Sequence, residues 1–387
     1  MRFTFKSLLL LLLPGAMLFA ATSGHALSAP APAAGPAYYL ALGDSLAAGV
    51  TKPGVPTDPG CTNPKTPGYV CVFYRYLLRV NPTFHVRNFA VSGANSCVLV
   101  HGLGGNSPCS DPLLTGAAPS QVDEALQFIQ SHSGQVNVIT LDVGGDDFLA
   151  ALVASITNPS AALQEIPAIL TSDQTDLDSA LQQLHAAAPQ AKILVINQYN
   201  PIGGASIPLL PTSFVNAAGQ ALDGLAAIDQ SEAEKYGATY VDVASAFNHA
   251  PGGAASLTYA VSSVLAGNLN QINVHPTPQG YAVYAHAVIS ASGYNAPLVL
   301  KAHLADSPIK KGAKGIVRGR SVPFDALTLR VKLPGGASRT VHGSVAEFGG
   351  VTVRFAASSK AGQGSLQLCV RGASAQKKCR SLSFTVR

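Results

Sequence analysis

Two different patterns of apolar residues divide this chain of 387 residues near position 298. In the first part, apolar strand-like runs alternate with longer helical stretches, which is typical of an α/β sheet covered by helices. Strands are expected over residues 86–91, 136–143, 192–198 and 239–243, and helices from Ser120 and over residues 173–187, 214–236 and 278–291. In the second part, short alternating runs separated by Gly, Pro and Ser predict a small all-β, sandwich-like domain. These runs are residues 327–333, 344–348, 351–356, 365–370 and 382–386.

The N-terminus has the composition of a secretory signal peptide, with Arg2 and Lys6 before an apolar run and small residues up to Ala26. We therefore expect a signal peptide over 1–26, an Ala/Pro linker over 27–37, a first domain over 38–297 and a basic accessory domain over 298–387. No other apolar run is long enough to span a bilayer. The mature protein is expected to be secreted, without a transmembrane segment.

Six cysteines in an exported chain favour disulfide bonds. Six cysteines allow 15 connectivities, and their local grouping favours nearest neighbours. The expected disulfides are Cys61–Cys71, Cys97–Cys109 and Cys369–Cys379.

Charge is distributed unevenly along the chain. The first 297 residues carry 9 Lys and Arg against 17 Asp and Glu, whereas residues 298–387 carry 16 against 3. The second domain could therefore contact an anionic surface or polymer, although the charges could equally serve as a well-solvated surface. Nucleic acid is not expected as a partner, because the domain lacks an array of aromatic residues for base stacking.

A hydroxyl nucleophile stands where the apolar run 38–42 ends, in Gly43-Asp44-Ser45. By itself this tripeptide is a common turn sequence. A catalytic serine also needs a base and oxyanion donors. His275, in the loop Asn273-Val274-His275-Pro276, is a candidate base, and the runs that end at Ser92-Gly93 and Gly144-Gly145-Asp146-Asp147 are candidate positions for the donors.

These four blocks, in this order, resemble the SGNH or GDSL-type hydrolases, a family of esterases, lipases and carbohydrate deacylases. The resemblance covers residues 38–294 and implies a flavodoxin-like three-layer αβα sandwich with a central parallel sheet. It implies that Ser45 is the nucleophile and His275 the general base, with the oxyanion hole formed by Ser45, Gly93 and the position of Asp146. Ester cleavage by such a site needs no cofactor, and the ten histidines and the sequence motifs indicate no metal site.

Asp146 stands where the family carries asparagine, and an ionised carboxylate there would repel an oxyanion. Desolvation could keep Asp146 protonated, so that its hydroxyl donates. Alternatively, the side chain turns away and two amides suffice, or it binds loop amides.

Ile272 stands where the family usually has the aspartate that orients the histidine. A neutral acceptor must then fix the imidazole tautomer. The candidates are a backbone carbonyl between Asn270 and Asn273 or the side-chain oxygen of either asparagine. Asp242 is a distant alternative that more often would cap a helix.

The sequence thus predicts a secreted serine esterase or lipase that acts through an acyl-enzyme on an acylated lipid or carbohydrate. Two largely apolar segments, residues 148–170 and 201–211, could wall an acyl pocket or could be ordinary core. The alternative is a secreted surface- or polymer-binding protein with a degenerate hydrolase site.

Overall fold

The computed structural model of the protein describes residues 35–111, 114, 116–149, 159–203, 212–266, 272–321, 326–345, 349–372 and 377–387. The expected signal peptide, most of the linker, Asn270 and the central parts of both apolar segments lie outside these residues. Among the helices of the described ranges, none is long and apolar enough to cross a membrane.

A five-stranded parallel sheet with the order β2-β1-β3-β4-β5 forms the centre of the first part of the chain. Its strands are β1 Ala37–Gly43, β2 Phe84–Asn88, β3 Val136–Asp142, β4 Lys192–Ile196 and β5 Thr239–Val241. Most residues of β1, β3 and β4 are buried, as expected for strands covered on both faces.

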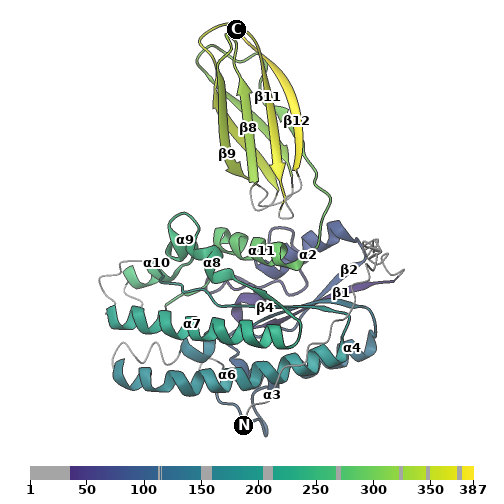
Figure 1. The fold of residues 1–387 in the computed structure, drawn as a ribbon, viewed down its shortest axis with the longest axis vertical. Helices are drawn as coiled ribbons and strands as arrows, with labels where there is room; N and C mark the ends of the chain where they lie inside the picture. Colours follow the sequence, from purple (N-terminus) through teal and green to yellow (C-terminus); the bar gives the residue numbers. More distant parts are fainter. Residues whose placement is uncertain are drawn as a thin grey trace, which may run out of the picture. The chain divides into compact units, whose positions relative to one another are not determined.

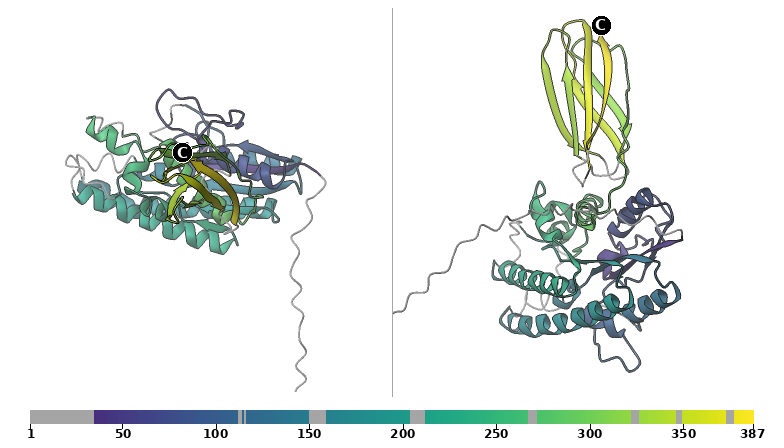
Figure 2. Two further views of the ribbon diagram at one scale, coloured as in Figure 1. Left: turned by 90° about the horizontal axis from the view of Figure 1, so that it is seen from above. Right: turned by 45° about the vertical axis from the view of Figure 1, so that its right-hand side comes forward.

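Helices cover both faces of this sheet (Figure 1 and Figure 2). Successive residues of β1 point to opposite faces, because Tyr39 and Ala41 belong to one apolar core and Leu40 and Leu42 to the other. The first core includes residues of α2 Tyr69–Val80, α8 Val243–Asn248, α9 Gly253–Leu257 and α11 Pro278–Ser292. The second includes residues of α3 Ser96–His101, α4 Gln121–Ser131, α6 Pro159–Ala187 and α7 Thr212–Lys235. Two short helices, α1 Ser45–Ala48 and α10 Ala260–Leu265, are also present, and the described residues 145–149 are helical as well. The predicted three-layer αβα sandwich is confirmed.

The structure differs from the predicted helices mainly at α6. The helix predicted over residues 173–187 begins at Pro159, because Pro167 is accommodated inside it. Proline removes one backbone donor from a helix, and here the helix continues through it. The predicted start at Ser120 holds for α4, since the Ser120 side chain accepts from the Asp123 amide.

Two antiparallel sheets follow in the last part of the chain, with the orders β10-β7-β6 and β12-β11-β8-β9. The strands are β6 Lys301–Leu304, β7 Lys314–Arg320, β8 Ala326–Lys332, β9 Ser338–Ser344, β10 Gly350–Ala356, β11 Gly362–Arg371 and β12 Lys377–Val386. One apolar core contains residues of both sheets. This arrangement fits the predicted small all-β domain.

The sequence pattern missed three of these strands, β6, β7 and β9. Strand β7 has the sequence Lys-Gly-Ile-Val-Arg-Gly-Arg and β9 is almost wholly exposed, so neither shows a regular apolar alternation. Most of the run predicted at 344–348 lies outside the described residues.

Three disulfide bonds join the cysteines that are neighbours in the sequence: Cys61–Cys71, Cys97–Cys109 and Cys369–Cys379. The last pair lies directly across the β11–β12 hairpin. Each bond closes a short loop, as the local grouping of the cysteines predicts.

Candidate active site

Ser45 is the first residue of α1, directly after the carboxyl end of β1, and it is 7% exposed. The turn into α1 requires glycine at position 43, because its φ is 145° and a Cβ there would collide with Asp142. Asp44 caps α1 by accepting from the Leu46 amide at 2.8 Å. The turn that presents Ser45 is therefore fixed by local hydrogen bonding and by the neighbouring strand.

Gln121 holds the same turn from the start of α4. Its side-chain Oε1 accepts from the Gly43 amide at 2.8 Å, and its Nε2 donates to the Gly43 carbonyl at 2.8 Å. Sequence reasoning missed this residue, because its partner is 78 positions away and no local motif marks the pair.

Asp142, the last residue of β3, is a second group that sequence reasoning missed. It is fully buried and accepts from the Tyr284 hydroxyl at 3.0 Å and from the Asp44 amide at 3.3 Å. Burial raises the pKa of its carboxyl to about 6, although these hydrogen bonds act in the opposite direction. Asp142 thus supports the turn before Ser45 from the adjacent strand.

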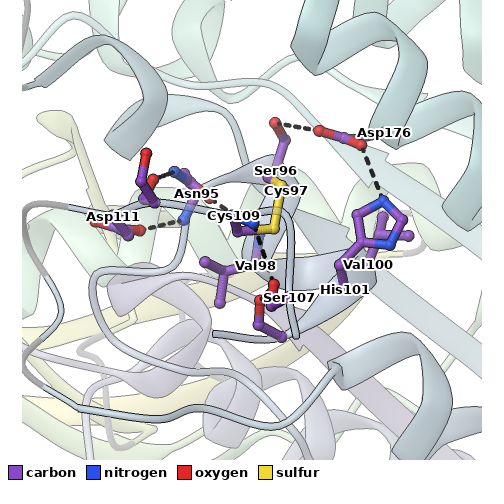
Figure 3. The surroundings of a disulfide bond; sticks show 12 residues. Asn95, Ser96, Cys97, Val98, Val100, His101, Ser107, Cys109, Asp111 and Asp176 are labelled. Atoms are coloured by element: carbon purple, nitrogen blue, oxygen red, sulfur yellow. Dashed lines mark hydrogen bonds and ion pairs between the residues drawn. A yellow bond between two sulfur atoms is a disulfide. The ribbon is translucent and has the colours of Figure 1, made fainter. Parts of the chain in front are cut away.

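Gly93 lies in a turn next to the end of β1. The amide of Val91 donates to the Gly43 carbonyl at 3.1 Å, and Gly93 itself has a φ of 89°. The segment that follows forms α3, whose Cys97 is bonded to Cys109 (Figure 3). Beside this disulfide, Asn95 accepts from the Val98 amide and donates through its backbone to Asp111. The disulfide and these bonds hold the chain directly after Gly93.

Asp146 and Ser45 line one cavity of about 70 Å³ among the described residues. Oδ2 of Asp146 is buried and has no hydrogen-bond partner in the part of the chain that the structure describes. Burial, followed by the charges of Asp111 and Asp147, raises the pKa of Asp146 to about 7. Near neutral pH the carboxyl group can therefore carry the proton that a donor to an oxyanion needs.

The other walls of the cavity are mostly apolar. The lining residues besides Ser45 and Asp146 are Asp44, Leu46, Gly145, Phe148, Leu149, Gln198, Tyr199, Pro201, Leu222 and Val274. Phe148, Leu149 and Pro201 belong to the ends of the two segments predicted as walls of an acyl pocket. Such a cavity can receive a small apolar group next to Ser45.

His275 is oriented by Asn273, whose Oδ1 lies 2.7 Å from its Nδ1. Nε2 of His275 is buried and has no hydrogen-bond partner among the described residues. Burial lowers the pKa of His275 to about 4. The imidazole is thus neutral above this pH, and with the proton on Nδ1 donated to Asn273, the lone pair of Nε2 is available to a base.

The loop that carries His275 is bonded to the segment after Ser45. The side-chain amide of Asn273 donates to the Thr51 carbonyl at 3.0 Å, and the Val50 amide donates to the Ser45 carbonyl at 3.0 Å. Val274, the neighbour of His275, lines the cavity with Ser45. Asp242 instead caps α8 by accepting from the Ser245 amide, and Ile272 is half-buried.

A family model described as the GDSL-like Lipase/Acylhydrolase family matches residues 41–283, which include every block described above. None of the curated proteins compared with the chain matches it.

Several solved structures are similar to the chain. They include an extracellular lipase from Streptomyces rimosus, with 20% identity, a TM-score of 0.47, and coverage of 66% of this chain and 99% of that one. A phospholipase A1 from Streptomyces albidoflavus NA297 has 19% identity and a TM-score of 0.43 over 66% of this chain and 99% of its own. A catalytic mutant of an acetylxylan esterase from Geobacillus stearothermophilus has 16% identity and a TM-score of 0.41 over 67% and 96%. The assignment itself rests on the family match, which covers more than half of the chain: the protein belongs to the GDSL-like lipase/acylhydrolase family and is a hydrolase of carboxylic esters.

Proposed function

We propose that the protein is a secreted serine esterase in which Ser45 forms the acyl-enzyme. The Ser45 oxygen attacks the ester carbonyl while Nε2 of His275 takes its proton. The tetrahedral intermediate then expels the alcohol, which takes that proton, and water hydrolyses the acyl-Ser45 ester by the same steps in reverse.

In this proposal the oxyanion is held by the amides of Ser45 and Gly93 and by the protonated carboxyl of Asp146. A neutral carboxylic acid can donate a hydrogen bond that a carboxylate cannot. The raised pKa of Asp146 supports this role, because about half of the molecules retain the proton near pH 7. The deprotonated form would repel the oxyanion.

The base side of the proposed site is a Ser-His dyad with a neutral orienter. Asn273 accepts from Nδ1 of His275 and so leaves Nε2 as the basic atom. The observation that carries the proposal is the contact between Asn273 and His275, together with the cavity that Ser45 and Asp146 line with Val274, the neighbour of His275.

The apolar walls of the cavity favour a short or medium acyl chain, attached to a lipid-like alcohol or to a carbohydrate. We also propose a chain organised as signal peptide 1–26, linker 27–37, catalytic domain 38–297 and accessory domain 298–387. The three disulfide bonds are consistent with an extracellular location.

Covalent labelling with a serine-reactive fluorophosphonate tests the proposed nucleophile. We expect labelling of Ser45, its loss in Ser45→Ala, and a large decrease in His275→Ala. Hydrolysis of nitrophenyl esters of increasing chain length, and of acetylated xylan, then gives the acyl preference. A decrease in kcat of roughly 10⁴-fold or more is expected for each variant, as for other serine nucleophiles and their bases.

The alternative function, a surface- or polymer-binding protein with a degenerate site, predicts the opposite result. In that case the folded wild type would not be labelled, and it would hydrolyse none of the esters faster than Ser45→Ala. Its favouring observations are the two departures at Asp146 and Ile272 and the basic charge of residues 298–387.

A further inference from the structure

The outward face of the three-stranded sheet β10-β7-β6 is strongly basic. Inward-facing residues of these strands, such as Val317, Val351 and Phe355, belong to the apolar core, so the alternate residues face solvent. Five exposed cationic side chains and one histidine lie on this outward face, which we call the basic face: Lys301, His303, Lys314, Arg318, Arg320 and Arg354.

One pair of like charges stands directly opposite across strands of the basic face. Lys301 of β6 is the register partner of Arg320 of β7, and His303 is the partner of Arg318. Arg354 of β10 lies diagonally from Arg318, since the direct partner of Arg318 is Thr352. Directly opposed like charges destabilise a sheet. Within the described residues, the ion pairs that the structure contains involve none of these side chains.

Acidic groups that could relieve this repulsion are scarce. Residues 298–387 contain Asp306, Asp325 and Glu347 as their acidic residues. Asp306 follows β6 and is exposed, whereas Asp325 and Glu347 lie outside the described residues. A cluster of cations with so few acidic neighbours gives the basic face a positive potential that can attract a polyanion.

The four-stranded sheet offers an internal comparison. A groove of about 360 Å³ at this sheet is lined by Arg330, Lys332 and Arg339 together with Ser, Thr and Gln side chains. Arg330 and Lys332 lie on the outward face, whereas Arg339 is the register partner of the buried Val331 at the edge strand. There, Arg330 is opposite Thr340 and Gln367, and Lys332 is opposite Ser338 and Ser365. The groove has a similar number of cations but no opposed pair among them. This sheet does place Arg371 opposite Lys377, at the end of the β11–β12 hairpin.

We propose that the basic face binds a linear polysaccharide that carries carboxylate groups. Lys314, Arg318 and Arg320 follow β7 over about 20 Å, with Lys301 and Arg354 on either side, which suits an extended chain of repeated negative charges. The arginines can form paired hydrogen bonds with carboxylates.

Other anionic partners fit the basic face less well. It carries no aromatic residue on which bases could stack. The large exposed apolar side chains among the described residues are Val55, Leu265 and Val299. Val299 lies two residues before Lys301 and is the one of these next to the basic face, whereas bilayer anchoring uses a larger apolar area. A polar and basic surface therefore favours a soluble polymer.

The test compares two triple variants of the full chain that remove the same charge. One is Lys301→Gln with Arg318→Gln and Arg320→Gln on the basic face. The other is Arg330→Gln with Lys332→Gln and Arg339→Gln in the groove. Binding to polygalacturonate is measured by affinity electrophoresis or calorimetry at several salt concentrations. We expect the first variant to lose about tenfold or more in affinity and the second about threefold or less.

The controls separate this proposal from the esterase proposal and from misfolding. Hydrolysis of a small nitrophenyl ester should be the same in both triple variants, whether or not the polymer binds. Thermal unfolding should show that the basic-face variant is at least as stable as the wild type, because it relieves the opposed pair Lys301–Arg320. Fully methyl-esterified polygalacturonate, which lacks the charges, should not bind.

Three results would overturn the proposal. One is an equal loss of affinity in both triple variants, which would indicate bulk charge alone. Another is binding to phosphatidylserine vesicles without binding to polygalacturonate, and the third is no binding of the wild type to polygalacturonate even at low salt.

Discussion

Two segments of the candidate site, residues 144–147 at the start of a helix and the histidine loop at residues 272–276, differ in which of them carries an acid. In the first, Asp146 has a carboxyl group whose pKa is raised by burial to about 7. In the second, the side-chain amide oxygen of Asn273 contacts the imidazole. The candidate site thus has a buried acid on one segment and a neutral amide on the other.

Because of this difference, we expect a different group to limit activity at each end of the pH range. His275, whose pKa is lowered by burial to about 4, must be neutral to act as a base. Asp146, whose pKa is raised by burial to about 7, must be protonated to donate. If both roles are right, activity rises through about pH 4 and falls through about pH 7. The pH profile therefore distinguishes the two segments: the histidine loop controls the acid limb, and residues 144–147 control the alkaline limb.

After the Ser45 and His275 variants, the largest effect is expected at Asp146. Replacing it with alanine removes an oxyanion donor and should lower kcat by about 10²–10³-fold. Asp146→Asn supplies a donor that does not titrate, so it should retain the maximal rate and lose the alkaline limb near pH 7. The measurement is kcat for a nitrophenyl ester between pH 3 and 10.

A strong loss of activity in Asp146→Asn would contradict the role of Asp146 as a protonated donor. Retention of the alkaline limb in that variant would show that another group sets it. Asp147 serves as the matched control, because it accepts from the amide and hydroxyl of Ser96 instead of lining the cavity.

A smaller effect is expected at Asn273, which positions His275 and does not contact the reacting atoms. Asn273→Ala should lower kcat by roughly tenfold to hundredfold with little change in KM, less than the 10⁴-fold loss known for a wrong histidine tautomer. Asn273→Asp should restore activity and move the acid limb upward from about pH 4, because an adjacent carboxylate raises a histidine pKa.

The pH profile separates this role from a merely structural one. A variant that had only lost packing would keep its acid limb in place. Equal acid limbs in Asn273→Asp and the wild type would therefore mean that Asn273 does not orient His275.

The smallest effect concerns stability. The pKa of Asp146 is 3.8 when unperturbed and about 7 in the folded protein, so between these values the folded state binds more protons than the unfolded state. Its contribution to the free energy of unfolding accordingly falls as the pH rises, by at most about 1.4 kcal/mol per pH unit. The free energy of unfolding of Asp146→Asn should increase relative to that of the wild type as the pH rises across this range. Urea unfolding at pH 4, 5.5, 7 and 8 measures this difference. A difference between the two proteins that stays constant with pH would exclude a raised pKa at this position.

Much of the fold followed from local sequence patterns. The apolar runs over residues 136–143 and 192–198 mark β3 and β4, and Ser120 marks the start of α4, because each signal depends only on neighbouring residues. The strands β7 and β9 could not be found in this way, since their charged and polar residues suppress the apolar alternation. They form because partner strands distant in the sequence pair with them.

The candidate site shows the same limit. The four motif blocks identified Ser45, Gly93, Asp146 and His275, but sequence alone left several acceptors open for the imidazole. The contact with Asn273 depends on how the loop folds, and the burial that shifts the pKa of Asp146 depends on the packing of the whole domain. Asp142 and Tyr284 could not be paired from the sequence, because 142 positions separate them.

The hydrogen bonds between Gln121 and Gly43 have a consequence for how this chain can vary. Strand β2 ends at Asn88, and β1 continues beyond it to Gly43. There, the side-chain amide of Gln121 accepts from the Gly43 amide and donates to the Gly43 carbonyl, which also accepts from the Val91 amide. Glutamate has the same shape but no donor, and asparagine is one methylene shorter. Gln121 therefore connects α4 to the turn that presents Ser45. A single substitution at position 121 would remove these hydrogen bonds while leaving the residues of α4 and Ser45 itself unchanged.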